Sequence, residues 1–341
     1  MGDNRGSSKK RVLSIDGGGV RGLIASQILE HLEQCLQDLD GEHARIADYF
    51  DMISGTSTGG IMCLMLAVPD SQGRPLFTAK QITDFYLKNS STIFPQSIFT
   101  AANGLFGPKY AAHPIERILK SYVGDLRMRD TLAIADASKN AFLRDVARGT
   151  SAAPTYFSPV EFETTEGTRF NLVDGGLAAN NPRFEDLLVL SLGCGNQTVS
   201  YSAKEAAGWG ALSWVTHRNG PPITNMLLNA SSDMVDYAIS ALFQVGLCEE
   251  NFLRIQTSTL ENATGQVDNS KPANLAELVK IGRQLIKEPV KRVNLHNGSY
   301  DLRPGMETNG EAIRRVQLSL PVRTWDVQPC LTTVTIGKIP S

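Results

Sequence analysis

Short apolar runs alternate with amphipathic segments along most of this 341-residue chain. The runs are rich in valine, isoleucine and leucine, a pattern typical of strands that are buried on both faces of a parallel sheet. They occupy residues 12–15, 49–54, 170–173 and 187–192. Strands of this kind, separated by helical segments, predict an α/β fold whose ligand site lies at the carboxyl edge of the sheet.

Helical spacing of apolar residues predicts the elements between the strands. The segment after Gly22 shows the pattern best, because apolar residues follow one face, charged residues fill the other, and Gly41 ends the helix. Weaker patterns predict helices at 61–67, 79–88, 114–123, 141–147, 203–215, 223–245 and 274–287. We therefore expect a disordered leader at 1–10, one domain at 11–315 and an irregular tail at 316–341.

Composition and charge narrow the function classes. Hydrophobic residues make up 42% of the chain and charged residues 20%, and the net charge of -2 lacks the basic footprint of a nucleic-acid binder. The longest apolar run, 61–68, is too short to span a bilayer, and residues 1–10 lack the apolar core of a secretory signal. Five scattered cysteines without a CxxC pair indicate reduced thiols, which favours a cytoplasmic location.

The motif DGGGVRG at residues 16–22 joins the first strand to the first helix. Glycines let the backbone turn its N–H groups toward an anion at a helix N-terminus, where the helix dipole also favours negative charge. Gly17, Gly18 and Gly19 are therefore candidates for stabilising a developing oxyanion. We expect Arg21 to orient this loop.

The same loop also matches the dinucleotide pattern G-x-G-x-x-G through Gly17, Gly19 and Gly22. In a dinucleotide site, Asp16 would place a carboxylate beside the bound pyrophosphate. No strand ending in an acidic residue follows about 20 residues later, as the dinucleotide fold requires. Both features weaken the dinucleotide interpretation.

A second turn follows the second strand, and its residues 55–59, GTSTG, match the nucleophile elbow G-x-S-x-G. In such an elbow the serine sits on a strained turn between a strand and a helix, and the glycines leave room on either side. Ser57 is therefore the candidate nucleophile, flanked by Gly55 and Gly59. A plain glycine-rich turn is the alternative for this pentapeptide alone.

A third polar group, Asp174, follows the strand 170–173 and precedes two glycines. As a bare motif Asp-Gly-Gly is usually a turn, but it would end at the same sheet edge as Ser57. Residues 91–110 combine large apolar residues with Gly and Pro and show little periodicity. We expect a loop packed on the core, with an apolar lip over the cleft as the alternative.

Four motifs in order, DGGGVRG, GTSTGG, TSAAPTYF and LVDGGLAANNP, resemble the patatin-like phospholipases, and their wording is closest to the plant patatins. The resemblance runs from about Arg11 to about Arg315. It implies a three-layer α/β/α fold with a mostly parallel central sheet and a helical C-terminal part. Residues 11–315 would then form one acyl hydrolase domain.

The resemblance also implies the chemistry. Ser57 would be the nucleophile and Asp174 its base in a Ser–Asp dyad, with the segment of Gly17, Gly18, Gly19 and Arg21 as the oxyanion hole. The family hydrolyses acyl esters of phospholipids and galactolipids without calcium, so no metal or other cofactor is expected. The expected partner is lipid at a membrane or micelle surface, which would make the protein peripheral to membranes.

The chain departs from the plant patatins in three places. Between Leu132 and Phe142 it is shorter and lacks a strand of the central sheet. Between Asn181 and Leu187 it lacks most of a helix, and the tail after Arg315 does not resemble the family. Either loops are absent from the sequence as given, or the chain is a trimmed variant of the family. The second case brings the continuity of the sheet into question but leaves both dyad positions present.

Other function classes stay open on the residues alone. An α/β-hydrolase triad in the order Ser, Asp, His would need His217 or His296, and neither lies in a glycine-bounded turn at a strand end. The remaining histidines are expected to be surface or core residues: His31, His43 and His113. A storage or interaction protein with residual esterase activity is a further alternative. A metal hydrolase is disfavoured because no His, Asp or Glu set has ligand spacing.

Overall fold

A computed structural model describes residues 9–96, 108–131, 140–152, 156–164, 166–174, 187–196, 202–210, 213–214, 222–297, 299–302, 305, 307–318 and 331–338. Its centre is a seven-stranded sheet in the order β3-β4-β9-β2-β1-β5-β6. The strands are β1 (Lys10–Ile15), β2 (Met52–Thr56), β3 (Val160–Glu163), β4 (Arg169–Asp174), β5 (Leu187–Leu192), β6 (Phe252–Ile255) and β9 (Leu331–Lys338). A separate hairpin pairs β7 (Lys291–Val293) with β8 (Tyr300–Leu302).

The central strands run parallel and the β3–β4 hairpin runs against them. β9, β2, β1, β5 and β6 form consecutive parallel pairs, whereas β4 pairs antiparallel with both β9 and β3. The carboxyl ends of β1, β2 and β5 therefore meet at one edge of the sheet. This is the edge at which open α/β sheets bind ligands.

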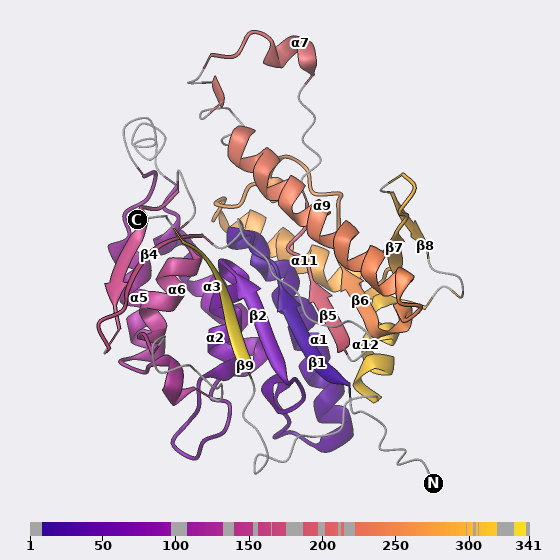
Figure 1. Cartoon of the computed structure of the whole chain (residues 1–341), viewed down its shortest axis with the longest axis horizontal. Helices are drawn as coiled ribbons and strands as arrows, with labels where there is room; N and C mark the ends of the chain where they lie inside the picture. The colour runs from indigo at the N-terminus through magenta and orange to yellow at the C-terminus, as the bar shows by residue number, and fades with distance from the viewer. Residues whose placement is uncertain are drawn as a thin grey trace.

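Helices lie on both faces of the sheet (Figure 1). They are α1 (Gly22–Asp40), α2 (Thr58–Ala67), α3 (Ala79–Ile93), α5 (His113–Val123), α6 (Leu143–Thr150), α7 (Ala203–Ala206), α9 (Pro222–Val245), α10 (Asn262–Gly265), α11 (Pro272–Lys287) and α12 (Asn309–Leu318). Figure 1 shows α1 and α11 behind the sheet and α9 on the viewer's side. The chain thus has the three-layer α/β/α architecture that its motifs imply. Among the described residues, no helix is both long and apolar enough to cross a membrane.

Alternation along β1 explains the two cores. Leu13 and Ile15 are 0% and 1% exposed and belong to the large core that includes α1. Val12, on the other face, packs with Phe243 of α9 and Val189 of β5 in a smaller core. A strand that buries both faces suits the continuous apolar run seen in the sequence.

The tail expected at 316–341 is not irregular throughout, so this prediction was wrong. α12 ends at Leu318, and β9 forms a strand in the middle of the sheet. The stretch LTTVTIGK is rich in β-branched residues, which favour strands. Its partners lie far away along the chain, so no local pairing pattern indicates it.

β9 keeps the sheet continuous between β2 and β4. Met52 pairs with Leu331 and Thr56 with Thr335, while Asp174 on the other side pairs with Ile336. The short stretch between Leu132 and Phe142 led us to expect that the central sheet lacks a strand there. Residues 132–139 lie outside the described part of the chain. Whatever that segment does, a strand from the C-terminal end of the sequence lies between β2 and β4.

Several other predicted boundaries differ from the structure. β1 begins at Lys10, inside the expected leader, because Lys10 pairs with Leu187 of β5. The helix expected at 203–215 ends at Ala206, and the patterns missed β3, β6, the β7–β8 hairpin and α12. These strands have three or four residues each, which is too short for periodicity to show.

The described ends of the segment 91–110 pack into the core. The rings of Phe94 and Tyr110 meet edge to face at 5.3 Å, and both lie 5.8 Å from Phe157. These contacts agree with a loop packed on the core. Residues 97–107, where a lip over the cleft would lie, are outside the described residues.

Candidate active site

Ser57 lies between the end of β2 and the first turn of α2. Its backbone has φ 53° and ψ -122°, and Leu247 is the only other non-glycine residue with positive φ in the described chain. Such a conformation is strained for a side chain and persists only where the surrounding structure holds it. The strand, the sharp turn and the helix together have the geometry of a nucleophile elbow. Ser57 remains partly exposed, so a substrate can reach it.

The glycines on either side of Ser57 are required by close packing. A Cβ at Gly55 would lie 2.5 Å from backbone atoms of Gly59, and a Cβ at Gly59 would lie 2.1 Å from the carbonyl oxygen of Ile15. Backbone atoms cannot move aside as a flexible side chain does. The expectation that no side chain fits beside the serine is therefore confirmed at both positions.

The glycine loop after β1 lies directly against the Ser57 turn. A Cβ at Gly17 would lie 3.1 Å from the Cβ of Ser57. Gly19 has φ +56, and a Cβ there would lie 2.0 Å from the carbonyl oxygen of Val267. The same oxygen accepts the N–H of Val20 at 2.8 Å. The loop is thus fixed between Ser57 on one side and Val267 on the other.

Three amide groups of this loop have no acceptor among the described residues: those of Gly17, Gly18 and Gly19. The next amides differ, since the N–H of Arg21 donates to the Gly18 carbonyl at 3.1 Å. Donors without an internal acceptor next to a reactive hydroxyl are what oxyanion stabilisation needs. The arrangement can therefore bind a negative charge that develops beside Ser57.

Arg21 holds the loop through carbonyl groups. Its side chain is buried, and its guanidinium donates to the carbonyl oxygens of Gly18 and Gly265, each at 3.4 Å. Burial lowers the pKa of Arg21. This geometry agrees with the expectation that Arg21 orients the loop, because both its N–H and its guanidinium donate to backbone carbonyl oxygens.

Three hydroxyl groups form hydrogen bonds with the backbone around the elbow. The N–H of Ser57 donates to Oγ1 of Thr150 at 2.8 Å, and Oγ1 of Thr58 donates to the Gly19 carbonyl at 2.8 Å. The hydroxyl of Tyr86 donates to the Thr58 carbonyl at 3.0 Å. Sequence reasoning assigned no role to Thr150, although it opens the motif TSAAPTYF and so could have been singled out.

Asp174 reaches the same level of the sheet as Ser57 by a different route. It is the last residue of β4 and pairs with Ile336, the residue after the Thr335 that pairs with Thr56. Neighbouring strands lie about 4.8 Å apart, so the backbones of Asp174 and Ser57 are about two strand spacings, or about 10 Å, apart across β9.

Asp16, at the carboxyl end of β1, is held by a residue that the sequence patterns missed. Its carboxylate accepts two hydrogen bonds from Arg254 of β6. No sequence spacing links the two residues, because the contact crosses the sheet between strands far apart in the chain.

Comparison with known proteins decides the family. The model of the patatin-like phospholipase family matches residues 13–187. The chain is 42% identical to Patatin-like protein 2 of Arabidopsis thaliana, with 84% of this chain and 85% of that protein covered. It is 38% identical to Patatin-like protein 2 of Oryza sativa subsp. indica over 90% of each chain, and 35% identical to Patatin-04/09 of Solanum tuberosum over 82% and 84%. The chain belongs to the patatin-like phospholipase family. Membership implies lipid acyl hydrolase activity.

The histidines of this member of the family do not gather around the elbow in the part that the structure describes. His31 lies within α1 beside Cys35, and His296 lies in the turn between β7 and β8 with its N–H on Asn294. His43 follows α1 and His113 begins α5, while His217 is outside the described residues. Among the described residues no three His, Cys, Asp or Glu side chains gather as metal ligands.

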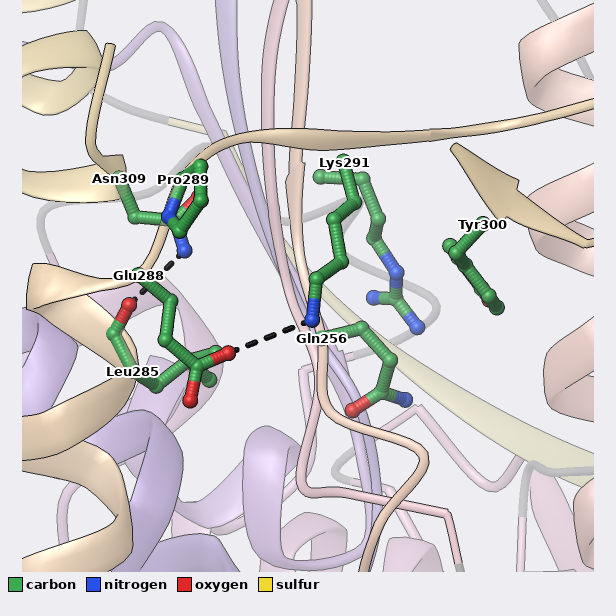
Figure 2. A pocket seen from close by; sticks show the side chains of 8 residues that line it. Gln256, Leu285, Glu288, Pro289, Lys291, Tyr300 and Asn309 are labelled. Atoms are coloured by element: carbon green, nitrogen blue, oxygen red, sulfur yellow. Dashed lines mark hydrogen bonds and ion pairs between the residues drawn. The ribbon is translucent and has the colours of Figure 1, made fainter. Parts of the chain in front are cut away.

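A shallow hollow lies elsewhere, beside Arg254 (Figure 2). Its lining comes from β6, the end of α11, the β7–β8 hairpin and the start of α12. Inside it, Lys291 pairs with Glu288 at 3.3 Å, and the amide of Asn309 donates to the Leu285 carbonyl at 2.8 Å. These polar groups satisfy one another, and none comes from the glycine turns. The hollow therefore offers no alternative to the Ser57 elbow as a reaction centre.

Proposed function

We propose that this chain hydrolyses fatty acyl esters of phospholipids and galactolipids as a calcium-independent phospholipase A-type serine esterase. Ser57 is the nucleophile, Asp174 is its base, and the amides of Gly17, Gly18 and Gly19 form the oxyanion hole. The observation that carries the proposal is the strained backbone of Ser57, which stands next to a loop whose amides have no acceptor among the described residues. Strain of this kind at a partly exposed serine indicates a nucleophile.

The register of the sheet supports the pairing of Ser57 with Asp174. Their backbones are about two strand spacings apart, about 10 Å. A serine side chain, an aspartate side chain and one hydrogen bond of about 2.7 Å together span a distance of this order when the two side chains point at each other. The dyad therefore needs no rearrangement of the sheet.

An aspartate is a weak base for a serine hydroxyl, since its ordinary pKa is about 3.9. Proton transfer completed before attack would cost too much free energy. We infer that the proton moves to Asp174 as Oγ of Ser57 attacks the ester carbon. The loop amides take up the charge that forms on the carbonyl oxygen, and losing one such donor typically costs about 10²–10³ in rate.

The reaction then proceeds through an acyl-enzyme. The tetrahedral intermediate collapses, the ester bond breaks, and the leaving alcohol of the lysolipid receives the proton from Asp174. A water molecule next gives a proton to Asp174 and attacks the acyl carbon on Ser57. The bond between Oγ of Ser57 and the acyl carbon then breaks, the fatty acid leaves, and Oγ takes the proton back from Asp174.

The substrate implies where the protein acts. Diacyl lipids are presented at a membrane or micelle surface, so we propose that the chain is a cytoplasmic protein that binds such a surface peripherally. No cofactor and no nucleic acid take part in the proposed reaction.

The test is product analysis on a panel of phospholipids, galactolipids and neutral esters, with Ser57→Ala as the blank. Asp174→Ala should abolish hydrolysis while the thermal unfolding midpoint stays near that of the parent protein. Turnover by Asp174→Ala close to the parent rate would refute the dyad. A fluorophosphonate probe should label the parent protein and leave Ser57→Ala unlabelled.

The same panel separates the alternatives. Loss of activity in His217→Ala or His296→Ala would support a Ser-Asp-His triad, whereas the dyad predicts that both variants stay active. Folded protein that neither labels nor hydrolyses any lipid would support a storage or interaction role.

A further inference from the structure

Asp16 stands where β1 ends and the glycine loop begins, and its carboxylate is held in a fork by Arg254. Nη1 of Arg254 donates to Oδ1 at 3.1 Å, and Nη2 donates to Oδ2 at 2.6 Å. The N–H of Asp16 donates to the Leu192 carbonyl at 2.9 Å. Both carboxylate oxygens are thus directed at the guanidinium, and such a bidentate pair fixes orientation as well as charge.

Arg254 is itself held by two other elements, β5 and α9, and a third, β8, holds its partner on α9. It pairs in register with Ser191 of β5, and its Nη1 donates to Oγ of Ser191 at 2.8 Å. Its Nε lies 2.7 Å from Oδ1 of Asp236 on α9. The hydroxyl of Tyr300 on β8 donates to the other oxygen of Asp236 at 2.7 Å. The guanidinium is therefore positioned by contacts outside the glycine loop.

This cluster is buried at its centre and open at one end. The side chains of Arg254 and Asp236 are 6% and 2% exposed, whereas that of Asp16 is 24% exposed. Burial alone would lower the pKa of Arg254, but the carboxylates of Asp16 and Asp236 outweigh it and raise the pKa. The guanidinium therefore stays charged, and Asp16, the most exposed member of the cluster, directly precedes the loop that begins at Gly17.

The sequence of the loop makes this restraint matter. An aspartate side chain readily accepts hydrogen bonds from backbone N–H groups two or three residues further along the chain. After Asp16 these groups belong to Gly18 and Gly19. A free carboxylate would occupy the donors that the oxyanion needs, and it would add a negative charge beside the one that develops on the substrate.

We propose that Arg254 is a positioning residue of the acyl hydrolase site. By holding both oxygens of Asp16, it keeps that carboxylate away from the amides of Gly18 and Gly19 and leaves them free for the oxyanion. The inference rests on the proposed function, because it concerns how the same site stabilises its transition state. Arg254 acts only through Asp16.

The first variant is Arg254→Met, which keeps the length of the side chain and removes the fork. The amides serve the transition state more than the bound ester, so kcat should fall about 10²-fold while KM stays within about threefold. The matched control is Arg11→Met, which breaks another Arg–Asp fork at the opposite edge of the sheet. The control should keep kcat within about threefold of the parent.

The double variant Asp16→Ala/Arg254→Met separates positioning from mere support of the fold. In the Asp16→Ala background the carboxylate that Arg254 restrains is gone, so adding Arg254→Met should change kcat by less than about threefold. A purely structural Arg254 would instead lower kcat by the same factor in both backgrounds.

Arg254→Lys covers the case in which Arg254→Met leaves the two carboxylates unpaired and the protein does not fold. Lysine keeps the buried positive charge but cannot hold both oxygens of Asp16 in a fixed plane. We expect kcat to fall roughly tenfold, the thermal unfolding midpoint to stay near that of the parent, and Asp16→Ala to cancel the effect in the same way.

The outcomes distinguish the two proposals. A parent protein with neither Ser57-dependent hydrolysis nor fluorophosphonate labelling overturns the proposed function. A parent protein and Arg11→Met variant that do both, together with folded Arg254 variants of unchanged kcat, overturn the role of Arg254. Equal losses with and without Asp16 overturn it as well.

Discussion

The two edges of the central sheet carry the same kind of ion pair in different settings. At the carboxyl edge, Arg254 holds the carboxylate of Asp16 in a fork. At the amino edge, Nε and Nη2 of Arg11 donate to Asp51 at 2.9 and 3.2 Å. Both pairs are largely buried. The pair itself therefore does not reveal which edge is functional.

The backbone around each pair makes the difference. Arg11 and Asp51 also exchange backbone hydrogen bonds, since the N–H of Arg11 donates to the Asp51 carboxylate and the N–H of Asp51 donates to the Arg11 carbonyl, each at 2.8 Å. The backbone N–H groups of both residues at this amino-edge pair thus have acceptors. At the carboxyl edge the amides of Gly17, Gly18 and Gly19 have no acceptor among the described residues. Unsatisfied donors cost stability, and they are tolerated where a ligand uses them.

The largest expected effect comes from interrupting β9, because this strand joins β2 to β4. Proline is introduced at Val334 and at Thr335 in separate variants. At the position whose N–H bonds to a neighbouring strand, proline should lower the free energy of unfolding by about 3 kcal/mol or more. Hydrolysis should fall by at least about 10²-fold, since the strands of Ser57 and Asp174 meet only through β9 among the described residues. Urea unfolding and lipid hydrolysis measure the two effects.

The control for these prolines is Thr332→Val, which keeps a β-branched side chain and the backbone N–H in the same strand. It should leave both stability and hydrolysis near the parent values. Full activity in both proline variants would show that β9 does not connect the two halves of the site.

Alanine substitutions at two glycines with positive φ, Gly19 and Gly41, test the same comparison with smaller expected effects. At Gly19, φ is +56 and a Cβ would lie 2.0 Å from the Val267 carbonyl, whereas at Gly41, φ is +93 and a Cβ would meet nothing within 4 Å. Gly19→Ala must shift the loop, so kcat should fall about 10²-fold. Gly41→Ala strains only the end of α1 and should cost about 1 kcal/mol of stability with activity unchanged. Equal kcat in the two variants would contradict a functional loop.

Breaking the amino-edge pair should affect stability alone. Arg11→Met removes the guanidinium that donates to the largely buried carboxylate of Asp51, which should lower the free energy of unfolding by about 2 kcal/mol. Chemical denaturation measures the loss, and hydrolysis of a soluble ester checks that turnover is retained. A fall in kcat as large as that of Arg254→Met would remove the distinction between the edges.

The sequence predicted those parts of the site that depend on residues adjacent along the chain. The turn at Ser57 and the close approach of Gly55 to Gly59 follow from local pattern, because a strand, a strained turn and a helix are contiguous in the chain, whereas the packing of Gly59 against Ile15 depends on β1. The boundaries of β5 and the end of α1 at Gly41 were predicted for the same reason.

The parts that depend on distant pairing were not predicted. Arg254 reaches Asp16 across β5, and β9 enters the sheet between β2 and β4 from the end of the sequence. Nothing in the spacing of residues indicates such contacts, since they follow from strand order. Asp174 lies between these cases: resemblance to the family selected it, and the register of β9 brings its backbone to the level of Ser57.

The smallest expected effect concerns Cys194, which lies under the glycine loop at the carboxyl edge. Its thiol donates to the Asp16 carbonyl at 3.1 Å, and a Cβ at Gly18 would lie 2.5 Å from the Cβ of Cys194. Burial, with the nearby charge of Asp16, raises the pKa of Cys194 to about 12. The thiol is therefore neutral at pH 8, where only about one molecule in 10⁴ carries the thiolate.

Iodoacetamide at pH 8 should leave Cys194 unmodified and hydrolysis unchanged in folded protein, whereas urea should expose the thiol and restore an ordinary pKa. Mass spectrometry of the peptide that contains Cys194 measures the difference. Rapid alkylation in folded protein with loss of hydrolysis would mean that the loop opens freely, and the rigid carboxyl edge on which the comparison depends would then be wrong.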